Sequence, residues 1–145
     1  MCIRDRVSTA PSTSGFICPL AGKSKSNITT GYHGYSGHTG VDFACGSGTS
    51  VMAAKGGTVV ISTALRNSSG NYRSYGEYIV ISHGDGTSTL YAHMLSGSRT
   101  VSEGTQVSQG QVIGQVGSTG NSTGPHLHFE VRVNGRCVNP TQYLP

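Results

Sequence analysis

The sequence contains no tryptophan, and only 7% of its residues are aromatic and 11% charged. Its apolar runs are a few residues long, far below the ~18 consecutive apolar residues that a transmembrane helix needs, so we expect no membrane span. Strong helix formers such as leucine and lysine are scarce, and no window of a dozen residues has the periodicity of an amphipathic helix. Glycine, by contrast, is abundant, with 22 residues. This composition predicts a mostly β protein.

The chain of 145 residues has the length of one ordinary domain, which excludes a two-domain enzyme. Its formal net charge of +4 is a mild excess. The basic residues are not clustered into the tract that marks a nucleic-acid footprint, so we expect no nucleic-acid partner. A polyanionic surface such as a cell wall would attract the chain weakly.

The four cysteines lie far apart and form no CxxC pair, which excludes a zinc ribbon and a thioredoxin-type motif. Disulfide formation among Cys18, Cys45 and Cys137 is compatible with an exported protein, and the sequence leaves the pairing open.

The chain is expected to divide into three parts. Residues 1–6, MCIRDR, are polar, lack the apolar segment of a signal peptide and resemble a cloning or sequencing adapter, so they are expected to be an adapter remnant that includes Cys2. Residues 7–27 are rich in serine, threonine, glycine and lysine around one short apolar patch, which predicts a linker or loosely held lead-in. Residues 28–145 are expected to form the functional domain.

Within this domain, turns that contain glycine alternate with short β-branched runs. Such spacing predicts packed antiparallel sheets. The turn at residues 83–86, His-Gly-Asp-Gly, predicts a hairpin. The predicted strands are Val51–Ala54, Thr58–Ser62, Glu77–Ser82, Thr87–Met94, Gln111–Val116 and His126–Val133.

Two of these runs indicate which side chains share a face. In residues 126–133 every odd-numbered residue is apolar and every even-numbered residue is polar. His126 and His128 therefore project from the same face of a strand whose other face packs on a core. In residues 87–94, alternation predicts that His93 projects opposite Met94 and toward a cleft. The expected faces are Leu90, Ala92 and Met94 on one side and Thr89, Tyr91 and His93 on the other.

The segment Gly-His-Thr-Gly-Val-Asp at residues 37–42 contains a histidine and an aspartate four residues apart. Its glycines favour extended chain, where an even offset keeps His38 and Asp42 on one face. These two side chains and a further histidine would form a three-ligand set that suits Zn²⁺ and leaves the fourth position open for water. Such a pair is a weak signal alone. Its combination with the His-x-His pair and His93 is much stronger.

Three ordered motifs resemble the M23 class of lysostaphin-type, or LytM-like, zinc endopeptidases: GHTGVD at 37–42, YAHM at 91–94 and GSTGNSTGPHLHFEV at 117–131. The resemblance runs from about residue 28 to residue 144. It implies an all-β lysostaphin-type peptidase fold, with packed antiparallel sheets of barrel-sandwich type and a groove that holds the metal.

The resemblance also implies a role for each matching residue. It implies that His38, Asp42 and His128 bind one Zn²⁺ per chain, and that His93 and His126 are catalytic without binding the metal. A tyrosine at the position of Tyr32 assists at the transition state in staphylolytic members. A water activated by zinc would be the nucleophile, with a histidine as general acid and base. Spacing does not decide which histidine is the base.

The function implied is a zinc-dependent endopeptidase that hydrolyses peptide bonds of bacterial peptidoglycan, in the cross-bridge or the stem peptide. The substrate implies a secreted protein in the extracellular space or cell envelope, and we expect a monomer. The bond itself stays open between Gly-Gly and D-Ala to a diamino acid, and Tyr32 slightly favours glycyl bonds.

Three alternatives compete with this function. The main one is a non-catalytic M23-like regulatory or cell-wall-binding domain, which is disfavoured because all five expected metal and histidine positions are filled. A glycosidase needs a carboxylate pair across a cleft, and the sequence pairs no two of its carboxylates. Residues 101–116 resemble the hammerhead of lipoyl and biotinyl carriers, but this run contains no lysine to be modified.

Overall fold

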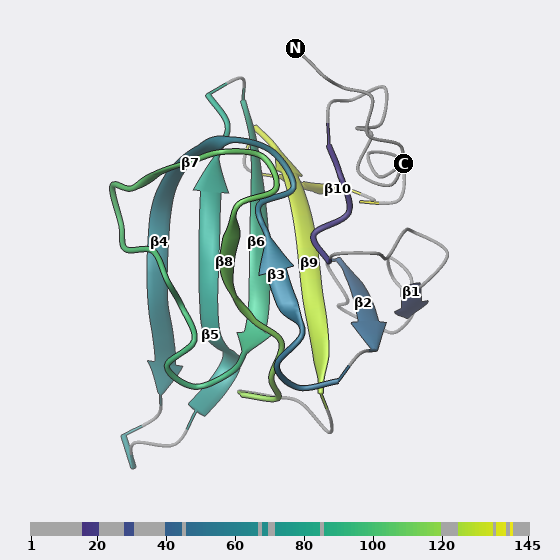
Figure 1. Ribbon diagram of the computed structural model, residues 1–145, viewed down its shortest axis with the longest axis vertical. Coiled ribbons are helices and arrows are strands. Elements are labelled where there is room, and N and C mark those ends of the chain that lie inside the picture. Colours follow the sequence, from purple (N-terminus) through teal and green to yellow (C-terminus); the bar gives the residue numbers. More distant parts are fainter. Residues whose placement is uncertain are drawn as a thin grey trace.

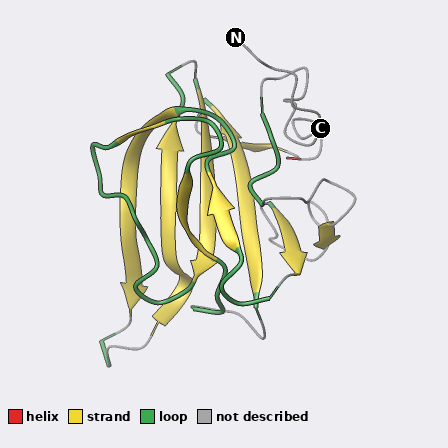
Figure 2. Ribbon diagram, viewed as in Figure 1, coloured by secondary structure: helices red, strands yellow, loops and turns green. Residues whose placement is uncertain are grey.

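The protein folds as two packed antiparallel sheets, and strands dominate the part of the chain that the computed structural model describes (Figure 2). This architecture confirms the all-β prediction. The described residues are 16–20, 28–30, 40–44, 46–66, 68–69, 72–84, 86–119, 125–134, 136–138 and 140. Within them, no helix is long and apolar enough to cross a membrane.

The larger sheet has eight strands in the order β1-β2-β9-β6-β5-β4-β7, with β10 paired to β9, and the smaller sheet consists of β3 and β8 (Figure 1). Every pairing is antiparallel. The strands are β1 (Ile28–Thr30), β2 (Val41–Ala44), β3 (Ser50–Met52), β4 (Gly57–Arg66), β5 (Tyr72–Ser82), β6 (Thr87–Met94), β7 (Gln106–Val107), β8 (Val112–Gln115), β9 (His126–Val133) and β10 (Arg136–Val138).

The predicted runs lie on β3, β4, β5, β6, β8 and β9. The predicted hairpin joins β5 to β6, where the His83 N–H donates to Thr87 O at 3.0 Å. Its Gly84 and Gly86 have φ values of 83° and 88°, a region that L side chains rarely adopt. Local sequence therefore specifies this connection.

The main core lies between the two sheets. Strands β3 and β8 cover one face of the larger sheet (Figure 1), and the core side chains there are fully buried. Alternate residues of β9 point into this core, as the odd-numbered pattern predicts. Its members include Val51, Ile79, Ile81, Tyr91, Ile113, Leu127, Phe129 and Val131.

The opposite face of the larger sheet, called the outer face here, carries a second and smaller apolar cluster. Val80, Leu90 and Ala92 form its buried part, with Tyr75 and Tyr78 packed against them. The even-numbered residues of β9 share this face, because Leu90 and Ala92 pair with Glu130 and His128 across the β6–β9 ladder. The outer face therefore combines aromatic and aliphatic packing with ionisable groups.

The expectation that residues 7–27 form a loosely held lead-in is wrong for residues 16–20. Phe16 and Leu20 are each 1% exposed and belong to the main core. The Ile17 N–H donates to Ala54 O at 2.9 Å, and Pro19 O accepts the Met52 N–H at 2.7 Å. The apolar patch between polar neighbours is thus a core element held by backbone hydrogen bonds. The rest of 7–27, and all of residues 1–6, lie outside the described residues.

Candidate metal and catalytic site

Asp42 and His128 form the centre of the candidate site. They are direct partners in the antiparallel β2–β9 pairing, so their side chains leave the same face of the sheet. Asp42 Oδ1 lies 2.9 Å from His128 Nδ1, and the two residues are 8% and 6% exposed. Strand register therefore holds a carboxylate oxygen and an imidazole nitrogen together, although the two residues are 86 positions apart in the chain.

Gly40 allows β2 to approach β9 this closely. A Cβ atom at this position would lie 2.2 Å from Phe129 O and 2.9 Å from Glu130 Cγ. Both separations are shorter than real Cβ contacts, so no other residue fits without movement of a strand. The glycine between His38 and Asp42 in the 37–42 motif thus has a steric function.

A β-bulge on β6 places His93. Ile79 of β5 pairs with Tyr91. The next pair joins Glu77 of β5 to Met94 of β6, so two residues of β5 lie opposite three residues of β6. One extra residue is therefore accommodated on β6, and His93 takes a φ of 60° there. Bulges of this kind redirect side chains and occur beside active sites.

The bulge corrects the predicted faces of β6. Alternation placed Met94 on the face opposite Tyr91, but both residues lie in the main core. Leu90 and Ala92 lie on the outer face as one set. His93 faces the other histidines, as expected, but for a different reason. Regular alternation would turn His93 into the core together with Tyr91, and the left-handed backbone at His93 prevents this.

His93 and His126 lie side by side at the site. Their ring centroids are 4.7 Å apart, and the His93 centroid is 6.0 Å from that of His128. The Nε2 atom of His126 lies 3.9 Å from Asp42 Oδ1. Since 19% of the His126 side chain is exposed, against 7% of His93 as a whole, His126 lies nearer to solvent.

Thr119 fixes the orientation of His93. His93 Nδ1 lies 2.7 Å from the carbonyl oxygen of Thr119, so Nδ1 carries a hydrogen and donates it. The Thr119 hydroxyl accepts the Glu77 N–H at 3.1 Å and donates to Met94 O at 2.6 Å. Burial outweighs the hydrogen bond to Thr119 and lowers the pKa of His93 to about 4. The ring is therefore neutral at neutral pH, with the lone pair on Nε2.

His128 has the opposite electrostatic environment. Burial favours the neutral ring, but hydrogen bonds to Asp42 and Glu130 outweigh it and raise the pKa of His128 to about 9. Two carboxylates thus face the two nitrogens of one imidazole. Such a site attracts a cation, whether a proton or a metal ion.

Glu130 is a site residue that sequence reasoning missed. Its carboxylate lies 2.9 Å from His128 Nε2, and the residue has no exposed surface. The even-numbered pattern of residues 126–133 was the available signal, because it places Glu130 on the same face as both histidines.

The described donors fit a zinc ion in kind and in place. Asp42 and His128 present one carboxylate oxygen and one imidazole nitrogen at a common point, and the carboxylate of Glu130 bonds to the other nitrogen of the ring, an arrangement that is common at zinc sites. The described residues alone contain no group of three candidate ligands. His38, the expected third ligand, and Tyr32 lie outside the described residues.

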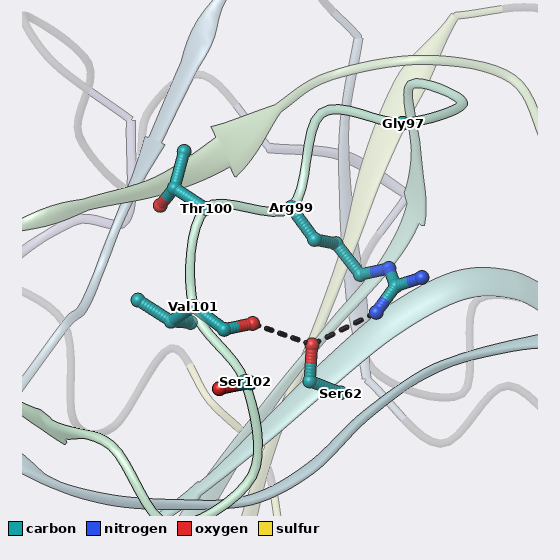
Figure 3. A pocket seen from close by; sticks show the side chains of 6 residues that line it. All are labelled: Ser62, Gly97, Arg99, Thr100, Val101 and Ser102. Atoms are coloured by element: carbon teal, nitrogen blue, oxygen red, sulfur yellow. Dashed lines mark hydrogen bonds between the residues drawn. The ribbon is translucent and has the colours of Figure 1, made fainter.

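A separate surface pocket of about 350 Å³ contains none of the site residues (Figure 3). Its lining is polar, and the Ser62 hydroxyl donates to Val101 O at 2.8 Å and accepts from Arg99 Nη1 at 2.9 Å. Arg99 also pairs with Glu77 at 2.9 Å. The lining residues are Ser62, Gly97, Arg99, Thr100, Val101 and Ser102.

Two further sequence observations concern residues near the core. Hydrogen bonds hold both ring nitrogens of His83: its Nδ1 lies 2.9 Å from Gly56 O and its Nε2 lies 3.0 Å from the Thr89 hydroxyl. Cys18 and Cys137 carry reduced thiols and do not form a disulfide with each other. Cys45 lies outside the described residues.

A family model for peptidase family M23 matches residues 36–140. The chain belongs to peptidase family M23. This match confirms the resemblance drawn from the three motifs. It covers all of the residues discussed above as metal or histidine positions, His38 included, and leaves Tyr32 outside.

Two curated M23 relatives differ in the function that their names state. The DD-carboxypeptidase/endopeptidase Mpg of Neisseria meningitidis serogroup B is 45% identical over 108 residues, which cover 74% of this chain and 23% of that protein. The murein hydrolase activator NlpD of Salmonella typhimurium is 37% identical over 139 residues, 95% of this chain and 33% of that protein. The chain thus spans a quarter to a third of the length of these relatives.

Solved M23 structures show the same fold. The catalytic domain of lysostaphin from Staphylococcus simulans is 34% identical, with a TM-score of 0.64 over 80% of this chain and 86% of that one. A zinc-containing peptidase from Vibrio cholerae is 35% identical, with a TM-score of 0.67 over 81% of this chain and 37% of that one. The predicted lysostaphin-type fold is therefore confirmed.

Proposed function

We propose that this M23 domain is a zinc-dependent endopeptidase that hydrolyses peptide bonds of peptidoglycan. The observation that carries the proposal is the convergence of Asp42 and His128 with a pair of adjacent histidines, His93 and His126, on one face of the sheet. A binding module needs no such combination of a cation-attracting pair and neighbouring proton carriers.

We propose His38, Asp42 and His128 as the ligands of one Zn²⁺, with Asp42 Oδ1 and His128 Nδ1 already 2.9 Å apart. When bound, zinc supplies Lewis-acid chemistry, because it polarises a carbonyl oxygen and acidifies water. The zinc-containing relative from Vibrio cholerae supports the choice of metal. The ligands are expected to release a proton on binding, since the pKa of His128 is raised to about 9.

We propose that His93 is the general base. Its Nδ1–H donates to Thr119 O, so the lone pair is on Nε2, and burial keeps the ring neutral by lowering its pKa to about 4. His93 then accepts the proton of the attacking water, a role worth typically ~10²–10⁴-fold in rate. His126, beside it and nearer to solvent, is placed to hand a proton to the leaving amine, and it regains a proton as His93 releases the one taken from water. Tyr32 remains proposed, on the family resemblance, as an assistant at the transition state.

The bond cut is proposed to be a DD bond of the stem peptide rather than a glycyl bond. The name of the Neisseria meningitidis relative, at 45% identity, supports this choice, as does that of the peptidoglycan DD-endopeptidase ShyA of Vibrio cholerae, at 43%. The earlier preference for glycyl bonds depended on Tyr32 alone. The substrate would place the protein in the cell envelope or outside the cell.

A second candidate function is regulation of another hydrolase. The murein hydrolase activator NlpD matches 95% of this chain, so the fold alone does not separate the two. Hydrolysis uses the metal-binding and proton-transferring side chains of the site, whereas binding to another hydrolase does not use them for chemistry. The presence of every expected metal and histidine residue in this sequence favours hydrolysis.

The test compares purified wild type with His128→Ala and with His83→Ala, a control in which a half-buried, hydrogen-bonded histidine outside the site is removed. The substrates are peptidoglycan with direct cross-links and peptidoglycan with glycine bridges, and released fragments are identified by mass spectrometry. We expect wild type and His83→Ala to cut the direct cross-link and His128→Ala to be inactive. Hydrolysis by His128→Ala would contradict the proposed site, and glycyl products would contradict the proposed bond.

A further inference from the structure

The carboxylate of Glu130, on the outer face, contacts the side chains of four residues. Its Oε2 accepts from His128 Nε2 at 2.9 Å and from the Tyr75 hydroxyl at 2.5 Å. Its Oε1 accepts from Arg132 Nε and Nη2 at 3.1 and 2.7 Å and lies 3.6 Å from the Cys137 thiol. The residue is 0% exposed. Neither oxygen can turn away from its partners without breaking several contacts.

Burying a carboxylate is costly unless charge and hydrogen bonds compensate for lost hydration. Arg132 supplies the opposite charge at 2.7 Å, and Tyr75 and His128 supply donors. Gly40 is required here too, because a side chain at that position would meet Glu130 Cγ.

We propose that Glu130 is a positioning residue: it accepts the Nε2–H of His128 and thereby assigns Nδ1, the nitrogen that faces Asp42, to the metal. The inference rests on the proposed function of the site. Tyr75 reinforces the arrangement, because its ring stacks on the His128 ring at a centroid distance of 5.7 Å and an interplanar angle of 25°. Carboxylates that hold a ligating histidine in this way change metal affinity or activity by roughly 10–100-fold when they are removed.

Zinc affinity is the first test, measured by competition with a chromophoric chelator on wild type, Glu130→Ala, Glu130→Gln and Glu77→Gln. Glu77 is the matched control because it too is a buried carboxylate paired with an arginine, and its side-chain partners are Arg99 and the Gly97 N–H. We expect Glu130→Ala to weaken zinc binding roughly 10–100-fold and Glu77→Gln to leave it within about twofold. Glu130→Gln retains an acceptor oxygen for Nε2–H and should recover part of the loss.

The second test assigns the ring nitrogens of His128 by NMR correlation of ¹⁵N with the ring protons, in the zinc-bound wild type. We expect Nε2 to carry the hydrogen and Nδ1 to show the shift of a metal-bound nitrogen. A purely structural role for Glu130 would lower stability without changing zinc affinity. Metal on Nε2, or wild-type zinc affinity in Glu130→Ala, would overturn the proposal.

If Glu130→Ala fails to fold, Glu130→Gln and the wild-type NMR assignment still decide the matter. The outcomes also separate this inference from the proposed function. A wild type that binds zinc through Nδ1 but cuts no peptidoglycan would refute the hydrolase and leave the role of Glu130 intact. Unchanged affinity in the Glu130 variants, with active wild type, would refute only the role of Glu130. A wild type that binds no zinc would refute both.

Discussion

Replacement of Gly40 by alanine tests whether close approach of β2 to β9 creates the metal site. The new Cβ would start 2.2 Å from Phe129 O. Since real Cβ atoms essentially never come within 3.0 Å of another heavy atom, the two segments must separate by about 1 Å, and overpacking of this kind costs about 1–3 kcal/mol. Metal–ligand distances tolerate only about 0.2 Å, so the separation should also disturb the alignment of Asp42 with His128.

We therefore expect Gly40→Ala to lower the free energy of unfolding by about 1–3 kcal/mol and to weaken zinc binding at least about tenfold. Urea unfolding of zinc-free protein measures the first effect and chelator competition measures the second. Gly46→Ala is the matched control, because a Cβ there would meet nothing within 4 Å; its stability should stay within about 0.5 kcal/mol of wild type. Wild-type zinc affinity in Gly40→Ala would refute the reasoning, even if stability fell.

Three further predictions concern neighbouring residues. Burial lowers the pKa of His93 from 6.5 to about 4, so the unfolded chain binds a proton that the folded protein does not, and the fold loses about 3 kcal/mol of stability as the pH falls from 6.5 to 4. Urea unfolding at several pH values should show that His93→Asn lacks this part of the pH dependence, and an unchanged slope would contradict it. Thr119→Val removes the hydroxyl that accepts the Glu77 N–H, which loosens the residue whose carbonyl oxygen orients His93. We therefore expect kcat to fall about tenfold and zinc affinity to be retained, whereas an equal loss of both would point to general unfolding. Tyr91→Phe leaves the buried Ala54 N–H without its phenolic partner, so the free energy of unfolding should fall by about 1–3 kcal/mol while the specific activity stays at the wild-type value. A thermal unfolding curve that matches wild type would be inconsistent with the predicted contribution of that bond.

The sequence predicts those parts of the fold that depend on local pattern. The strict alternation in residues 126–133 places His126 and His128 on one face, and the structure confirms this by burying Leu127 and Phe129 in the main core. The hairpin at 83–86 is likewise local, because its glycines supply the positive φ values that the turn requires.

Features that depend on distant pairing could not be predicted in the same way. The bulge at His93 follows from a mismatch between β5 and β6, and no property of residues 87–94 alone reveals it. The burial of Phe16 depends on strands that come much later in the chain, and its polar neighbours in the sequence disguise it. Glu130 stands on the predicted face, but its burial depends on Tyr75 of β5 and on Arg132.

The proposal that the site binds zinc is tested most directly by metal content. Wild type and His128→Ala would be purified in parallel, dialysed against metal-free buffer and analysed for zinc, and the hydrolysis of peptidoglycan would be followed before chelation, after chelation and after zinc is restored. We expect close to one zinc per chain in wild type and much less in His128→Ala. Only wild type should be active, and its activity should disappear on chelation and return when zinc is restored. Equal zinc in both proteins, or hydrolysis that survives complete removal of the metal, would contradict it.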